Sequence, residues 1–437
     1  MLLSKKNKSG FSDSSYLTIR KFFYYLTIII LVLLPVYHWY LPPFMILYGI
    51  IFLIGSVNKA SEFQKLPVKN KLLFYCFILF FLWQVIGMIY SDHNQEGLRN
   101  LSLRLPLLLF PLILVVPDLT IRQKTIKLLR IFAVSTFLYV IACLVYASFR
   151  SLEISEGNWS INPHPDEYPW LNFFYGPDFA IFQHPSYLSM YILLSVFIAF
   201  EALFEKSDSK LIKWFWLLVS LVLIFSVYLL SSRAAIIAAV ITIPCYFIIK
   251  LITGKIKKIW WIGVCSGAII LFFTLLSNPR LQLLFNQSSD QELINKALKE
   301  SRISIWNASF NLIKENFLLG VGTGDIQYEL NEEYKRMGKR DLYKDKELNA
   351  HNQFIETSAE HGLIGLLLLL SVFGLMVGVA VTNRNILYLM FILIVLISFL
   401  FETMLNRLAG LAFFSAFSFL LLYVDSQDVD NKSFIKD

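Results

Sequence analysis

Three side chains in this sequence could together transfer a group from a phosphorylated substrate. Arg233 and Arg302 carry guanidinium groups, which hold phosphate oxygens through paired hydrogen bonds. His351 precedes Asn352 and Gln353, and a neutral imidazole can accept a proton from an attacking hydroxyl near neutral pH. Two anion-binding cations and one general base are the groups that such a transfer needs.

Each of these residues also has a plainer interpretation. Arg233 lies where two apolar blocks meet, so it could be an interfacial arginine, although its depth favours anion binding. Arg302 begins an amphipathic run through Trp306, and its spacing favours a solvated charge on a surface helix. A single loop histidine such as His351 is most often only a surface residue.

Two other polar features carry weaker signals. The run Gly320–Gly324 follows a predicted helix and not a strand, so we interpret it as a turn and not as a phosphate loop, although its amides could still hold an anion. The possible metal ligands of one outer segment match no familiar spacing, and we expect neither a catalytic metal nor a cofactor. These ligands are His164, Asp166, Glu167 and His184.

The elements that position these residues must be mostly apolar helices. The chain has 437 residues, 57% hydrophobic and 16% charged, with a mean hydropathy of +0.61. Apolar residues gather in about twelve blocks of a length that crosses a bilayer. The blocks are 22–37, 43–57, 71–90, 104–116, 124–149, 187–203, 212–231, 234–250, 258–277, 362–382, 385–401 and 408–424. We predict an all-α polytopic membrane protein with about 12 transmembrane helices, forming a single membrane domain over residues 1–437.

The distribution of lysine and arginine predicts the orientation. With the N-terminus inside, the basic loops between the first nine spans all fall on the cytoplasmic side. The net charge of +8 is scattered over these short loops, which argues against a nucleic-acid partner. We expect both termini in the cytoplasm. We also expect an aromatic-rich outer loop at 150–186, lying against the lipid headgroups, and a large outer loop with short helices at 278–361.

The order of these polar elements resembles the signature of the O-antigen ligase and O-antigen polymerase superfamily. The matching elements are His184-Pro185-Ser186-Tyr187, Ser232-Arg233, Arg302-x-x-x-Trp306, Leu319-Gly320-Val321-Gly322-x-Gly324, His351-Asn352, Gly362-x-x-Gly365 and the stretch from Glu402 to Gly410. Each element alone is weak evidence for the resemblance. The specific feature is the ordered set combined with the predicted topology.

The resemblance implies a GT-C-like glycosyltransferase of the bacterial inner membrane. Such an enzyme transfers a glycan from undecaprenyl pyrophosphate to an acceptor hydroxyl at the periplasmic face, with inversion and without a metal. It implies His351 as the catalytic base and Arg233 and Arg302 on the pyrophosphate. Further candidate substrate-binding residues are Gln353, His184 and Arg104.

The acceptor stays open within this superfamily. A large loop carrying both Arg302 and His351 fits O-antigen ligation to lipid A-core best, and polymerisation and protein O-oligosaccharyl transfer are the alternatives. A transporter or flippase for lipid-linked glycans is a different class. It would show inverted repeats and ionisable residues at mid-membrane, whereas the polar groups here gather at the outer rim. A structural scaffold would give Arg233 no purpose.

Overall fold

The computed structural model describes residues 13–55, 59–117, 119–155, 158–163, 172–205, 208–254, 289–339, 342 and 348–424. The prediction of an all-α membrane protein is confirmed, because seven helices in these ranges are long and apolar enough to cross a membrane. They are α4 (Val68–Gly87), α5 continuing into α6 (Asn94–Arg104 and Pro106–Leu114), α8 (Thr125–Arg150), α9 (Pro185–Phe204), α10 (Lys210–Leu230), α11 (Arg233–Ile252) and α17 (Gln353–Thr382).

The remaining helices complete the bundle and its loops. They are α1 (Asp13–Val36), α2 (Leu41–Gly55), α3 (Lys59–Gln64), α7 (Leu119–Gln123), α14 (Ser289–Glu315), α15 (Ile326–Arg336), α18 (Ile386–Phe401), α19 (Leu408–Leu420) and the 3-10 turns His38–Tyr40, Gly176–Phe179, Met404–Asn406 and Leu421–Tyr423. A hairpin of β1 (Leu152–Ser155) and β2 (Asn158–Ile161) follows α8. The predicted span 258–277, the loop start 278–288, both terminal segments and the segment 164–171 lie outside the described residues.

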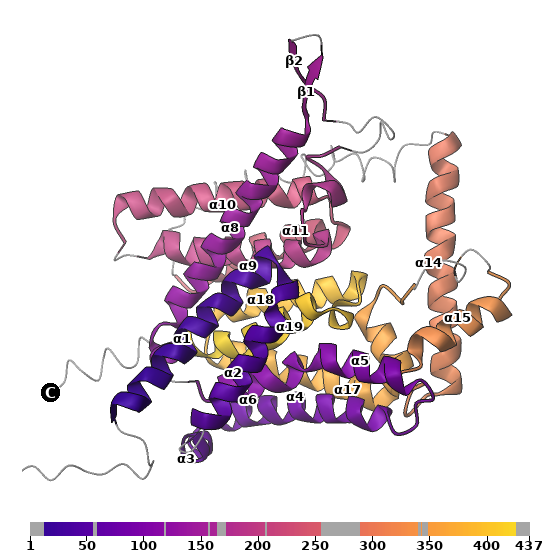
Figure 1. Cartoon of the computed structure of the whole chain (residues 1–437), viewed down its shortest axis with the longest axis horizontal. Helices are drawn as coiled ribbons and strands as arrows, with labels where there is room; N and C mark the ends of the chain where they lie inside the picture. The colour runs from indigo at the N-terminus through magenta and orange to yellow at the C-terminus, as the bar shows by residue number, and fades with distance from the viewer. Residues whose placement is uncertain are drawn as a thin grey trace, which may run out of the picture.

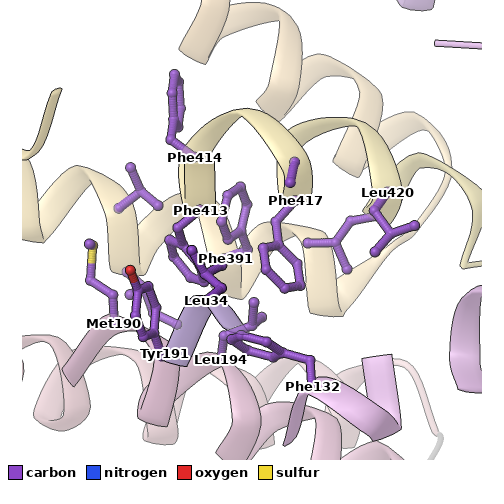
Figure 2. Packing of buried hydrophobic residues seen from close by; sticks show 14 of the residues in the cluster. Leu34, Phe132, Met190, Tyr191, Leu194, Phe391, Phe413, Phe414, Phe417 and Leu420 are labelled. Atoms are coloured by element: carbon purple, nitrogen blue, oxygen red, sulfur yellow. The ribbon is translucent and has the colours of Figure 1, made fainter. Parts of the chain in front are cut away.

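The centre of the bundle is α9, which is buried along nearly its whole length. Tyr191 of α9 packs on Phe413 of α19 with ring centroids 5.0 Å apart, and Phe413 contacts Phe391 of α18 at 5.4 Å. Figure 2 shows these rings interlocking with Phe132 of α8 and Phe417 of α19. Offset and edge-on aromatic contacts add to the stability gained from burial alone. This packing holds α8, α9, α18 and α19 together at the centre of the bundle.

Helix α17 is broken at Gly362, which has φ +65° and ψ −167°. The break divides α17 into a short first half before Gly362 and a long second half that packs along α4 (Figure 1). Backbone carbonyls freed by a break must find other donors when they are buried. Three carbonyl oxygens are freed, and each finds a donor. The Ala359 oxygen accepts from Val321 N at 2.9 Å, and the Glu360 oxygen accepts from Gly322 N at 3.0 Å. The His361 oxygen accepts from Trp83 Nε1 at 2.9 Å.

The turn Gly320–Gly324 therefore fills the break in α17. Gly320 and Gly322 have φ of +75° and +107°, a conformation that favours glycine. A Cβ atom on Gly324 would lie 2.4 Å from the carbonyl oxygen of His93, so only glycine permits this approach to the α4–α5 connection. The interpretation of this run as a turn is confirmed, and its amide donors are used within the protein.

Helices α14 and α15 lie together at one end of the bundle (Figure 1), which we call the loop end. Their facing sides form a small separate core that includes Leu312, Leu330 and Tyr334. Asp325, just before α15, accepts hydrogen bonds from the backbone amides of Asp92 and His93, both at 2.9 Å. The α14–α15 unit is thus attached both to the α4–α5 connection and to the break in α17.

Candidate active site

His351 occupies a strained turn at the loop end. Its φ is +46°, which is uncommon for a residue with a side chain. The turn is held on several sides: His351 N donates to Asn349 Oδ1 at 3.1 Å, and Ala350 N donates to Glu356 Oε2 at 2.9 Å. Trp306 Nε1 of α14 donates to the Ala350 carbonyl at 2.9 Å. Strain maintained by so many contacts is typical of a functional site.

The turn leads directly into α17, and Asn352 caps that helix. Its Oδ1 accepts from Phe354 N at 2.9 Å and from Ile355 N at 3.1 Å, while its Nδ2 donates to the Leu400 carbonyl of α18 at 3.2 Å. The capping fixes the turn relative to both helices. It also places His351 at the positive end of the α17 dipole, where anions are favoured.

The partner of His351 is Glu402, directly after α18. His351 Nδ1 lies 2.9 Å from Glu402 Oε1, with both side chains partly exposed at 30% and 19%. Because an ionised carboxylate only accepts hydrogen bonds, Nδ1 carries the proton. Nε2 then presents a lone pair, and it makes no hydrogen bond with any described residue. This tautomer suits a general base.

The pKa of Glu402 reflects the same pairing. Burial acts to raise it, but the hydrogen bond from His351 and the charges of His351 and His184 outweigh burial, so the pKa lies below its usual value. Glu402 is therefore ionised at neutral pH. It can stabilise the imidazolium that forms when His351 takes a proton.

Replacing Glu402 with glutamine should make the thermal stability of the protein fall less steeply as the pH is lowered. Because the folded pKa lies below the usual 4.5, Glu402 stabilises the fold fully above that pH and loses this contribution as the pH falls through the folded value. Thermal unfolding in detergent from about pH 3 to 7 would measure this. Glu332→Gln, which removes an exposed carboxylate of α15, is the control. Parallel profiles for wild type and Glu402→Gln would contradict the pairing.

His184 caps the start of α9 and belongs to the same cluster. Its Nδ1 accepts from Ser186 N at 3.3 Å. Burial lowers the pKa of His184, and the charges of Arg407 and His351 lower it further against the opposing effect of Glu402. His184 is therefore neutral at pH 7. These mutual effects place His184 within electrostatic range of the His351–Glu402 pair.

Arg407 is a cation of this cluster that the sequence did not single out. It precedes α19, whose first residues contact the start of α9: Tyr191 OH donates to the Ala409 carbonyl at 2.9 Å. Arg407 is exposed, and its side chain makes no hydrogen bond or ion pair with the described part of the chain. The only sequence signal was its place in the familiar stretch from Glu402 to Gly410. Its donors are thus open to an anionic ligand near His184 and Glu402.

Arg302 approaches the His351 turn from α14. It lies one helical turn before Trp306, whose indole contacts Ala350, and residues four apart share a helix face. Arg302 is half-buried. The prediction that Arg302 and His351 lie in one region is therefore consistent with the packing of α14 on α17.

Arg233 lies on a separate helix, α11. It is the exposed first residue of α11, after Ser231, which is left-handed at φ +50° and donates from Oγ to Tyr175 OH at 3.0 Å. Helix α11 packs against α18, the helix that Glu402 directly follows. A shared site for Arg233 and Glu402 stays a prediction.

Gln353 and Arg104 point inward, away from the open side of His351. Both amide ends of Gln353 are used: Oε1 accepts from Leu405 N at 2.7 Å and Nε2 donates to Thr357 Oγ1 at 3.1 Å. Arg104, 5% exposed, lies 2.7 Å from Glu360 Oε2 and 3.1 Å from His361 Nε2.

The two inward-pointing residues line a small cavity between α4, α5 and the first half of α17. Their contacts favour a supporting role beneath the His351 turn over direct contact with substrate. A second layer of this kind holds functional side chains in place. Among the described residues no cluster of histidine, cysteine or carboxylate side chains could hold a metal ion, and His164, Asp166 and Glu167 lie outside them.

Comparison with known proteins shows which family this region is similar to. Residues 218–370, which include Arg233, Arg302 and His351, match the O-antigen ligase family model. The resemblance to the O-antigen ligase and polymerase superfamily is thereby confirmed. The chain is also 23% identical over 342 residues to the teichuronic acid biosynthesis protein TuaE of Bacillus subtilis (strain 168). The match covers 76% of this chain and 65% of that protein.

Proposed function

We propose that this protein transfers a glycan from undecaprenyl pyrophosphate to an acceptor hydroxyl, at a loop end that faces the periplasm of the inner membrane. The observation that carries the proposal is the strained His351, whose Nδ1 is held by Glu402 and whose side chain is 30% exposed. The match of this region to the O-antigen ligase family supports it.

The proposed reaction is a single displacement with inversion. The acceptor oxygen attacks the sugar carbon that is bonded to the pyrophosphate, and His351 Nε2 takes the acceptor proton. The carbon–oxygen bond to pyrophosphate breaks, and its electron pair stays on the pyrophosphate oxygen. Glu402 stabilises the imidazolium, so base and carboxylate act as a pair. General-base catalysis of this kind contributes about 10²–10⁴-fold.

The leaving group needs positive charge because its oxygens become more negative as the bond breaks. Arg302 and Arg233 are proposed to hold the pyrophosphate, and Arg407 adds a third guanidinium beside His184 and Glu402. Fixed charges in a site with little water stabilise such a transition state by several kcal/mol. The N-termini of α17, which Asn352 caps, and of α19 add to the positive potential.

For the acceptor, we propose the hydroxyl of a lipid A-core, as in O-antigen ligation. The similarity to a protein of teichuronic acid biosynthesis supports a second candidate, polymerisation, in which the hydroxyl belongs to another carrier-linked glycan. Protein O-oligosaccharyl transfer uses the same chemistry with a protein hydroxyl. Purified protein in vesicles, given a carrier-linked glycan and each acceptor in turn, would separate the three. If glycan is transferred to none of these acceptors, the proposed function is contradicted.

Arg302→Lys tests the phosphate contact. Lysine keeps the charge but loses the planar fork, so we expect transfer to fall by about 10²-fold or more. The control is Arg336→Lys in α15, an exposed arginine of the same loop that pairs with Glu333 and Glu315. Initial rates of transfer in vesicles measure the effect. If both variants keep near-normal rates, Arg302 is a solvated surface charge and not a phosphate ligand.

Metal independence gives a second test. If guanidinium groups alone balance the pyrophosphate charge, chelation by EDTA should leave the transfer rate of the purified protein unchanged. The rate is measured before and after extensive dialysis against the chelator. A loss of transfer that added Mg²⁺ restores would refute the metal-free mechanism.

A further inference from the structure

The β1–β2 hairpin has one apolar and one polar face. Leu152 pairs with Ile161, and Glu153 pairs with Ser160. Partners opposite one another share a face, and residues two apart in a strand do as well, so Trp159 joins Leu152 and Ile161. These three side chains are 44%, 71% and 75% exposed in the order Leu152, Trp159 and Ile161. An isolated two-stranded hairpin is marginal in water, so this apolar face needs a partner.

The apolar face continues the lipid-facing surface of α8. Leu138, Val145 and Phe149 are 59%, 63% and 74% exposed and lie on one side of this membrane-spanning helix. In a membrane such a stripe contacts acyl chains. Leu152 follows three residues after Phe149, so the hairpin begins where the lipid-facing stripe ends.

Aromatic and basic residues mark the headgroup level at this point. The Arg150 guanidinium lies 4.0 Å from the centroid of the Phe173 ring and 5.6 Å from that of Tyr146. Arginine and aromatic side chains at the end of a span are typical of the membrane–water boundary. The hairpin therefore starts at the level of the lipid headgroups, and not far out in water.

The direction of the hairpin agrees with this depth. In Figure 1, α4, α10 and α17 run side to side, which gives the direction in which the bundle crosses the membrane. The hairpin points across that direction, away from the bundle and not toward α14 and α15. On its polar face, Glu153 Oε1 accepts from Asn162 Nδ2 at 2.8 Å. A segment that is amphipathic and runs along the membrane plane fits a lipid surface.

We propose that the β1–β2 hairpin lies flat in the loop-end leaflet, with Leu152, Trp159 and Ile161 in contact with phospholipid acyl chains and Glu153 and Ser160 facing water. Tryptophan suits this boundary because its ring is apolar and its N–H is polar. The hairpin would thus extend the membrane contact of α8 sideways and fix the tilt of a helix that packs on α9. This proposal does not depend on the reaction carried out at His351.

Spin labelling tests the proposal face by face. A cysteine-free background, with Cys76, Cys143, Cys245 and Cys265 replaced, would receive single cysteines at Trp159, Ser160 and Ile161. The labelled proteins are placed in vesicles of phosphatidylethanolamine and phosphatidylglycerol. Collision rates with oxygen, which concentrates in lipid, and with a soluble nickel chelate are then compared. We expect a higher oxygen-to-nickel ratio at 159 and 161 than at 160.

Equal nickel accessibility at all three positions would place the hairpin in water and overturn the proposal. Protection of all three from both reagents would mean that a protein surface covers it, which also overturns the proposal. Should Trp159→Cys not fold, Ile161→Cys reports on the same face. Brominated phospholipids give a second measurement: Trp159→Phe should reduce the lipid-quenched part of the tryptophan fluorescence, and an unchanged quenched part would count against it.

Discussion

Replacing His351 with alanine is expected to lower the rate of glycan transfer by about 10²–10⁴-fold. The side chain supplies the Nε2 lone pair that we propose takes the acceptor proton, and its Nδ1 is the group that pairs with Glu402 Oε1. Because the imidazole is 30% exposed and its turn is held largely through backbone contacts, the loss should fall on activity far more than on folding.

The measurement is the rate of transfer in vesicles, alongside protein level and thermal unfolding temperature. Glu402→Gln provides the intermediate case, since it keeps the shape of the side chain but removes the charge that stabilises the imidazolium. We expect its rate to lie between wild type and His351→Ala. Normal transfer by His351→Ala would end the assignment of a base at this position. A wild-type rate for Glu402→Gln would show that Glu402 does not assist the base.

Replacing Gly362 with alanine should have an effect of similar size for a different reason. An added Cβ would lie 2.2 Å from the Leu318 carbonyl oxygen, and the backbone at φ +65° and ψ −167° is itself unfavourable by about 1–3 kcal/mol for an alanine. To relieve this contact, the turn Gly320–Gly324 and the first half of α17 must separate. That half-helix begins directly after the His351 turn, and a misplacement of about 1 Å in an active site can cost about 10²-fold in rate.

The same helix offers matched controls for this substitution. Alanine at Gly374 or Gly378 would meet no atom within 4 Å, so both variants should transfer glycan at the wild-type rate. Transfer rate and thermal unfolding are measured for all three. If Gly362→Ala behaves like Gly374→Ala, the break in α17 does not position His351, and the tight packing of the glycine turn has no bearing on catalysis.

The sequence alone determined the class of protein and most of its helices. Apolar blocks of about 20 residues are a local property of the chain, because a span must satisfy its own backbone and bury its own side chains in lipid. The candidate residues His351, Arg302 and Arg233 were also recognisable, since a histidine or arginine beside an apolar block stands out. The small hairpin after α8 was not expected, because two four-residue strands give a weak pattern.

Only the tertiary structure decided how these residues act. Glu402 meets His351 across 51 positions of the chain, and the Gly320–Gly324 turn meets the break at Gly362 because both backbones approach closely. Arg104 and Gln353 were predicted to bind substrate, yet packing turns both into buried contacts, and Arg407 faces the open side instead. Such pairings arise from the packing of distant helices, which side-chain type and local spacing do not encode.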